Sequence, residues 1–144
     1  MQSRPLGKGP LTVSEISYGT WLTVAGGVER AQAIACIHAA LDQGITLFDT
    51  ANQYGAGEAE RVLGEGLRTS SHSRDRYCIA TKLFNPVGDE PDKGLSAAQV
   101  AKQLDRSLER LGTESFGWRH RARAEGSARP GHGKHPQRRR SAGR

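Results

Sequence analysis

The sequence has few cysteines, no long apolar run and, from residue 115 to residue 144, none of Val, Ile, Leu or Met. The two cysteines, Cys36 and Cys78, lie far apart in apolar stretches, which excludes a Cys-x-x-Cys ligand spacing and favours buried, reduced thiols. No apolar run approaches the ~20 residues of a membrane span or the length of a signal core. We therefore expect a soluble, cytoplasmic protein with no membrane partner.

Charge divides the chain into two parts at Glu114. Residues 115–144 carry 9 of the 21 Lys and Arg residues but 1 of the 15 Asp and Glu residues. A segment so basic and so poor in aliphatic side chains cannot bury a core, so we predict a disordered tail after a folded part at 1–114. The abrupt change, and a composition typical of GC-rich coding DNA, lead to the hypothesis that the tail is an out-of-frame translation product.

The folded part alternates short apolar runs with amphipathic stretches. Residues 5–18 mix turn formers with β-favouring residues, which predicts a small hairpin leading into a first strand that ends at Tyr18. The alternation that follows indicates βαβ units and a parallel sheet, either doubly wound or closed into a barrel. The expected elements are helices at 29–43, 58–67 and 97–111, the last with Ser96 as N-cap and Gly112 behind it, and strands at 45–48 and 77–81.

Three polar side chains occupy positions where parallel α/β folds place their chemistry. Asp49 ends the second expected strand, Tyr54 follows in the next loop, and Lys82 ends the third strand. A tyrosine with an ordinary pKa near about 10 is a poor acid at neutral pH, and a neighbouring ammonium favours its ionised form. Lys82 supplies such a charge and Asp49 can keep it protonated, a set that donates a proton to a carbonyl oxygen.

Each of these three residues also has an ordinary interpretation. Asp49 can be a loop or helix cap, Lys82 a solvated strand end, and Tyr54 a half-buried loop aromatic, because polar strand ends are common without any chemistry. Their joint placement at one end of the sheet favours function.

The segment at 44–64, GITLFDTANQYGAGEAERVLG, resembles the signature of the aldo-keto reductase superfamily. Gly-Thr-Trp at 19–21, Ile-Ala-Thr-Lys at 79–82 and Ser-Leu-Glu-Arg-Leu-Gly-Thr at 107–113 follow in the family's order. The resemblance covers about 4–114, and its details resemble the branch that includes potassium-channel β-subunits and their bacterial relatives. It implies a (β/α)8 TIM barrel, here only its first three βα units preceded by a β-hairpin.

The resemblance also implies an NADP-dependent oxidoreductase that reduces small aldehydes or ketones. Tyr54 would be the proton donor, and Lys82 and Asp49 the pair that tunes it. Asp49 would also lie near the nicotinamide end of NADP(H), together with the segment Gly19, Thr20 and Trp21. No metal ligand is implied.

Glycines in the loop after Tyr54 do not make a dinucleotide fingerprint. A Gly-x-Gly-x-x-Gly motif that starts with Gly55-Ala56-Gly57 would need a third glycine at position 60, which is Glu60. A loop also separates these glycines from the preceding strand. In the family the cofactor phosphates are held largely by loops late in the barrel, which this sequence does not contain.

The resemblance ends where family members continue into a fourth strand with a terminal histidine. Residues 115–120 include His120 but no aliphatic strand, so the catalytic role is not assigned to it. Three βα units cannot close an eight-stranded barrel, and the third strand keeps an open edge. We expect the isolated chain to be impaired: unstable or prone to aggregate, with weak NADPH binding.

Two other functions remain open at the level of sequence. One is a non-catalytic, cofactor-binding regulatory subunit built on the same barrel. The other is nucleic-acid binding through basic residues such as Arg138-Arg139-Arg140. Phe116 and Trp118 are the aromatics of the tail, so base stacking has little support and a nucleic-acid partner is not favoured. The sequence fixes neither the substrate nor the oligomeric state.

Overall fold

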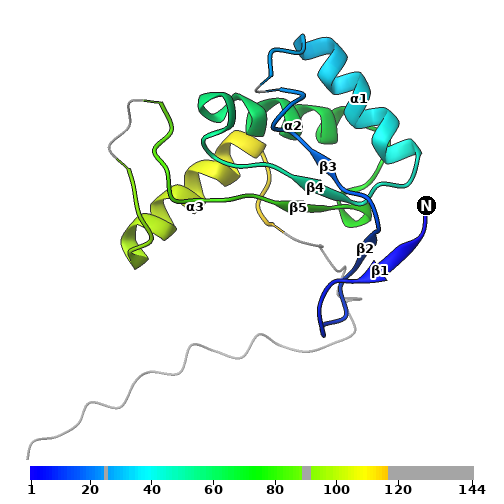
Figure 1. The fold of residues 1–144 in the computed structure, drawn as a ribbon, viewed down its shortest axis with the longest axis horizontal. Coiled ribbons are helices and arrows are strands. Elements are labelled where there is room, and N and C mark those ends of the chain that lie inside the picture. The colour runs from blue at the N-terminus through cyan, green and yellow to red at the C-terminus, as the bar shows by residue number, and fades with distance from the viewer. Residues whose placement is uncertain (25, 89–91, 117–144) are drawn as a thin grey trace, which may run out of the picture.

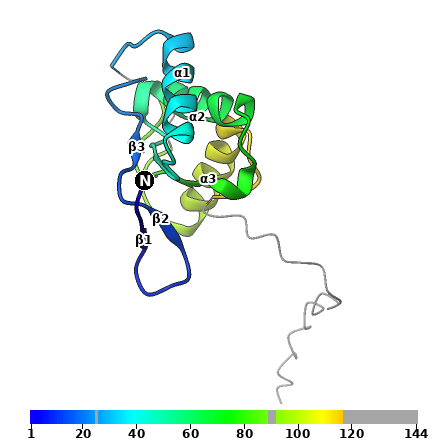
Figure 2. The same ribbon diagram turned by 90° about the vertical axis from the view of Figure 1, so that its right-hand side faces the viewer.

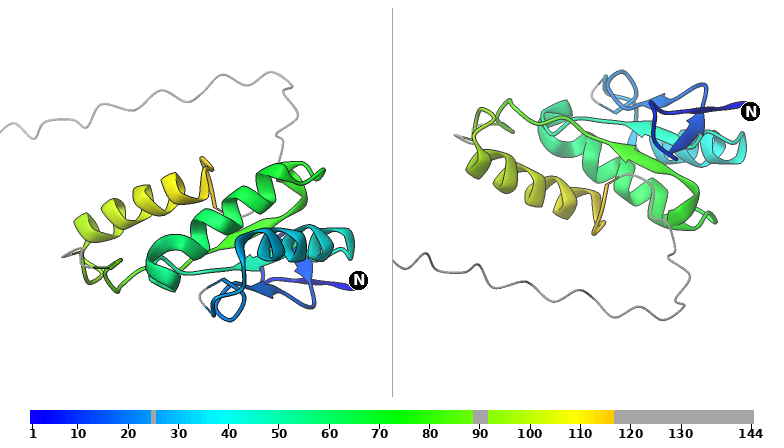
Figure 3. Two further views of the ribbon diagram at one scale, coloured as in Figure 1. Left: turned by 90° about the horizontal axis from the view of Figure 1, so that it is seen from above. Right: turned by 90° about the horizontal axis from the view of Figure 1, so that it is seen from below.

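A three-stranded parallel sheet carries three helices on one of its faces in the computed structural model, which describes residues 1–24, 26–88 and 92–116 (Figure 1). The view from above shows the helices in front of the strands, and the view from below shows the strands in front of the helices (Figure 3). The chain thus alternates strand and helix as predicted. In order, the elements are β3 (Tyr18–Gly19), α1 (Arg30–Asp42), β4 (Leu47–Asp49), α2 (Glu58–Thr69), β5 (Cys78–Ala80) and α3 (Ala97–Leu111).

The predicted hairpin precedes this sheet. Strand β1 (Ser3–Pro5) pairs antiparallel with β2 (Thr12–Ser14), and Figure 2 shows the hairpin projecting away from the helices. Its attachment is a reciprocal pair of 2.9 Å hydrogen bonds, from Ser14 N to Thr46 Oγ1 and from Thr46 N to Ser14 Oγ. Because Thr46 immediately precedes β4, the hairpin lies at the amino-terminal edge of the sheet.

Strand register brings the carboxyl ends of β3, β4 and β5 into line. Gly19 pairs with Asp49, and Asp49 pairs with Ala80, with β4 in the middle of the order β3-β4-β5. The alignment continues past the strand ends, since Thr20 N donates to Asp49 O at 3.0 Å and Thr50 N donates to Ala80 O at 2.9 Å. Residues that follow each strand therefore share one edge.

The core lies between the sheet and helices α1 and α2. Phe48 and Ile79 alternate with residues of the opposite face, so both point toward the helices and are buried. They meet Ile37 of α1 and Leu63 and Leu67 of α2 in one apolar cluster. Burying a side chain of this size contributes about 1.5–3 kcal/mol, so a few such residues determine which face of each helix turns inward.

Helix α3 begins and ends as predicted but buries an unexpected face. Ser96 Oγ accepts a hydrogen bond from Gln99 N, and Gly112 ends the helix at φ 60°. The apolar residues whose spacing predicted the helix are half-buried, apart from the buried Leu111. The other buried positions of the helix are polar: Gln103, Ser107 and Arg110. Gln103 and Arg110 are buried because the strand-end loops and α2 supply their hydrogen-bond partners, and Ser107 accepts from Arg110 within the same helix.

One prediction about the cysteines is wrong. Cys78 is buried in β5 as expected, whereas Cys36 of α1 is exposed. Apolar neighbours do not bury a helical residue, because successive side chains on a helix turn by about 100° and the buried Ile37 points away from Cys36.

The prediction of a disordered tail from residue 115 is wrong at its first two residues: Phe116 packs against the apolar core, and Ser115 O accepts a 2.8 Å hydrogen bond from Arg74 Nη2. The rest of the tail, including His120, lies outside the described residues. None of the helices in the described part of the chain has both the length and the apolar character that a membrane crossing requires.

Candidate active site

The Lys82 ammonium joins Asp49 and Tyr54 at the carboxyl edge of the sheet. Lys82 Nζ lies 2.6 Å from Asp49 Oδ2, 2.9 Å from Thr50 O and 3.4 Å from the Tyr54 hydroxyl oxygen. The three side chains that the sequence predicts to converge are therefore in mutual contact through one nitrogen.

Each of the three comes from a different kind of local structure. Asp49 is the last residue of β4, Lys82 lies two residues beyond β5, and Tyr54 opens a short helical turn before α2. In that turn Gly55, Ala56 and Gly57 all have positive φ, at 57°, 53° and 89°. Glycine adopts this conformation freely, whereas Ala56 does so at a cost of about 1–2 kcal/mol. The turn directs the chain sharply from the Tyr54 loop into α2.

The charges around Lys82 keep it protonated. Burial lowers the pKa of the Lys82 ammonium, but the hydrogen bond and the negative charge of Asp49 outweigh burial, and Tyr54 adds to them. The net pKa of Lys82 is therefore above its ordinary value of 10.5. Both side chains remain open to solvent, with 52% of Lys82 and 40% of Asp49 exposed, so a bound molecule can reach them.

Aromatic rings form one wall of the site. The rings of Trp21 and Tyr54 meet edge to face with centroids 4.7 Å apart, and Lys82 Nζ lies 5.1 Å from the centre of the Tyr54 ring. An ammonium near a ring face is attracted to its negative quadrupole. Trp21 is 55% exposed, which leaves much of its ring uncovered beside the phenol.

The other two predicted cofactor-site residues, Gly19 and Thr20, differ in accessibility. Thr20 is fully buried, and its hydroxyl donates to Thr50 Oγ1 at 2.9 Å and to Asp49 O at 3.3 Å. Its side chain is thus committed to holding β3 against the end of β4. Gly19 is exposed, and a Cβ added there would meet no described atom within 4 Å. Open space therefore lies beside Gly19 at the same edge.

Sequence reasoning missed a buried amide pair next to Lys82. Asn52 N donates to Lys82 O at 3.1 Å, and Asn52 Nδ2 donates to Gln103 Oε1 at 3.1 Å. Gln103 Oε1 also accepts from Phe84 N at 3.2 Å, which connects α3 to the loops after β4 and β5. The spacing of apolar residues does not reveal such positions, because a glutamine in an amphipathic helix is normally predicted to face solvent.

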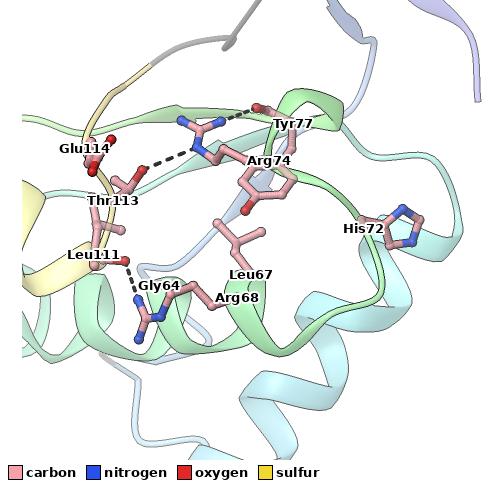
Figure 4. A pocket seen from close by; sticks show the side chains of 10 residues that line it. Gly64, Leu67, Arg68, His72, Arg74, Tyr77, Leu111, Thr113 and Glu114 are labelled. Atoms are coloured by element: carbon pink, nitrogen blue, oxygen red, sulfur yellow. Dashed lines mark hydrogen bonds between the residues drawn. The ribbon is translucent and has the colours of Figure 1, made fainter. Parts of the chain in front are cut away.

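A hollow of about 550 Å³ lies at the opposite edge of the sheet. Tyr77, which precedes β5, lines it together with Leu67 and Arg68 of α2 and Leu111 of α3, and Arg74 projects across its upper part (Figure 4). Guanidinium groups of both arginines donate to backbone carbonyls around the hollow. It contains none of the three converging residues, so it is separate from the candidate site.

Comparison with known proteins gives a consistent result. The sequence model of the Aldo/keto reductase family matches residues 15–118. A rice protein named as a probable voltage-gated potassium channel subunit beta (Oryza sativa subsp. japonica) is 37% identical over 111 residues, which are 77% of this chain and 34% of that protein.

Solved structures resemble the fold as well. An aldo-keto reductase from Bacillus halodurans, in its holo form, has a TM-score of 0.68 and 29% identity, and the match covers 81% of this chain and 38% of that one. A structure from Pseudomonas aeruginosa, described as an aldo-keto reductase, has a TM-score of 0.67 and 33% identity over 79% of this chain and 44% of that one.

The chain spans about a third of the length of the rice relative and less than half of either solved structure. Its strand-helix units match only part of each of these structures. The fold is therefore part of a (β/α)8 barrel, as the sequence predicts. The family match extends over most of the chain, including Asp49, Tyr54 and Lys82. The chain therefore belongs to the aldo-keto reductase family of oxidoreductases.

Proposed function

We propose that this chain carries the proton-donating half of an NADPH-dependent reductase of aldehydes or ketones. The observation that supports this proposal is the position of Lys82 Nζ, 2.6 Å from Asp49 and 3.4 Å from the Tyr54 hydroxyl. An ammonium held by a carboxylate beside a phenol is the arrangement expected of a tyrosine that gives up its proton.

The roles of the three residues follow from their contacts. Tyr54 donates its proton to the carbonyl oxygen of the substrate, and Lys82 stabilises the tyrosinate that remains. Asp49 holds Lys82 in place and, by raising the pKa of its ammonium, keeps the positive charge available across the neutral range. The hydride for the carbonyl carbon comes from NADPH when that cofactor is bound.

The described residues suit the nicotinamide end of such a cofactor. The open space beside Gly19 and the uncovered ring of Trp21 leave room for a flat ring near the Asp49 carboxylate. Thr20 supports this edge from behind through its hydrogen bonds to β4.

A Tyr54→Phe substitution tests the proposal in a complete barrel, made by joining residues 1–114 to the later barrel units of a related reductase. Carbonyl-dependent oxidation of NADPH should fall by about 10²–10⁴-fold, because the general acid is lost while the ring stays in place. Tyr77→Phe is the matched control: it makes the same change at the opposite edge of the sheet and should leave the rate unchanged. Equal rates for Tyr54→Phe and the unmodified barrel would refute the role of Tyr54.

A second candidate function is that of a cofactor-binding regulatory subunit. It is favoured by the rice relative, whose name assigns it to a potassium channel as a β-subunit. The same completed barrel separates the two functions. A subunit of this kind would bind NADPH in a fluorescence titration yet show no carbonyl-dependent oxidation with any aldehyde or ketone supplied.

A further inference from the structure

A buried ion pair lies behind the candidate site, on the helix side of the sheet. Glu60 of α2 is completely buried, and its Oε2 is 2.6 Å from Nε of Arg110 on α3, whose side chain is 7% exposed. Arg110 Nη2 also donates to Ser107 Oγ at 3.1 Å. The second carboxylate oxygen, Glu60 Oε1, accepts a 2.7 Å hydrogen bond from the hydroxyl of Thr81.

Stability alone is a weak reason for such a pair. Removing two charges from water carries a desolvation penalty that their attraction offsets only with good geometry, and apolar replacements are often neutral or stabilising. What a buried, fully bonded carboxylate does provide is a fixed position for its partners. Glu60 fixes the position of Thr81 with the oxygen that Arg110 does not use.

Thr81 connects this buried pair to Lys82. Strand β5 ends at Ala80, so Thr81 and Lys82 lie beyond its strand pairing. Successive side chains of an extended chain point to opposite faces. Thr81 reaches toward α2 and Lys82 reaches toward Asp49, in agreement with that alternation. Holding the Thr81 hydroxyl on the helix side therefore directs Lys82 toward the site.

We propose that Glu60 is a positioning residue for Lys82 and acts on it through the Thr81 hydroxyl. Arg110 keeps the Glu60 carboxylate charged and oriented. Without the Thr81 contact, the segment that carries Lys82 keeps the hydrogen bonds from Asn52 N to Lys82 O and from Phe84 N to Gln103 Oε1, neither of which involves Thr81. The Lys82–Asp49 contact is then made for a smaller fraction of the time. The catalytic meaning of this arrangement rests on the function proposed above.

The test uses the full chain and measures the pKa of Lys82 by NMR of its ¹³C-methylated amine, assigned by the signal that Lys82→Arg removes. Thr81→Val deletes the hydroxyl at nearly constant volume, and Thr81→Ser keeps it. We expect the pKa of Lys82 to fall by about half a unit in Thr81→Val, and to stay unchanged in Thr81→Ser. The signals of Lys8 and Lys102 should not move in either variant.

A second pair of variants separates the hydrogen bond from the ion pair. Glu60→Gln with Arg110→Met removes both charges but keeps an oxygen that accepts from Thr81, whereas Glu60→Leu with Arg110→Met removes the acceptor too. We expect the lowered Lys82 pKa only with Glu60→Leu, while urea unfolding reports the stability of each double variant.

An unchanged Lys82 pKa in both Thr81→Val and Glu60→Leu with Arg110→Met would overturn the proposal and leave Glu60 with a purely structural role. Because this measurement needs no turnover, a failed Tyr54→Phe test leaves its outcome intact.

Discussion

Cys36 and Cys78 have the same side chain in opposite surroundings. Cys36 is exposed on α1, whereas Cys78 is buried in β5, where burial raises the pKa of its thiol and the nearby charge of Arg74 partly offsets the rise. The thiolate is the reactive form of cysteine. Burial therefore protects Cys78 twice, by blocking access and by keeping the thiol protonated.

We predict that an aromatic disulfide reagent modifies one thiol of the folded chain rapidly at pH 8 and the second only on unfolding. Mass spectrometry after a short reaction should find the label on Cys36. Cys36→Ser removes the rapid phase and serves as control. Rapid labelling of both cysteines without urea would show that β5 opens readily and would contradict the burial of Cys78.

Residues of the candidate site differ in how far the sequence reveals them. Asp49, Tyr54 and Lys82 were predicted, because a polar residue at the end of an apolar strand stands out against its neighbours. Glu60 and Gln103 were not predicted to be buried, since a charged or amide residue within a helix normally faces water. Only their partners across the fold explain their positions.

Helices α2 and α3 approach closely enough to exclude a single methyl group. A Cβ added at Gly64 of α2 would lie 2.2 Å from the carbonyl oxygen of Leu111 in α3. At Gly66, the nearest atom is instead Cδ1 of Ile37, at 2.8 Å. A backbone carbonyl cannot move without the helix that carries it, whereas the end of a side chain can shift to another rotamer.

We predict that Gly64→Ala lowers the free energy of unfolding by about 2 kcal/mol or more, although alanine by itself favours a helix by about 1 kcal/mol over glycine. Gly66→Ala makes the same change two residues away in the same helix and should cost clearly less. Urea unfolding followed by circular dichroism measures both. Equal effects of the two substitutions would show that α3 is free to move away from α2.

The order of the helices and the ends of α3 follow from the sequence, whereas the face that α3 buries does not. Ser96 and Gly112 mark the two ends of α3 by local hydrogen bonding and a positive φ, which neighbouring residues are enough to produce. Its buried polar face depends on Glu60, Asn52 and backbone groups far away in the chain.

Several ionisable groups with raised pKa values make the stability of the described part of the chain depend on alkaline pH. Burial raises the pKa of Tyr18, Tyr77 and Cys78, and Asp49 raises that of Lys82 against the effect of burial. In each case the folded chain keeps its proton to a higher pH than the unfolded chain. Their stabilisation is therefore complete below the ordinary pKa values, 9.0 for cysteine and 10.0 for tyrosine, and is lost as pH rises through the folded values.

We predict that the urea concentration at the midpoint of unfolding decreases as the pH is raised from 8 to 11. The decrease should begin near the ordinary cysteine pKa of 9.0. Tyr77→Phe removes one titrating group and should make the decline shallower. A midpoint that stays constant or rises over this range would mean that these side chains ionise as easily in the folded chain as in the unfolded one.

The sequence by itself determined the alternation of strands and helices, the ends of α3 and the presence of an acid, a phenol and an ammonium near strand ends, because these depend on residues close together in the chain. Tertiary structure decided that Cys36 is exposed, that α3 buries polar residues, and that Thr81 hydrogen-bonds to a buried ion pair. Each of these outcomes depends on partners supplied by distant elements, and only the packing of strands and helices determines which residues become neighbours.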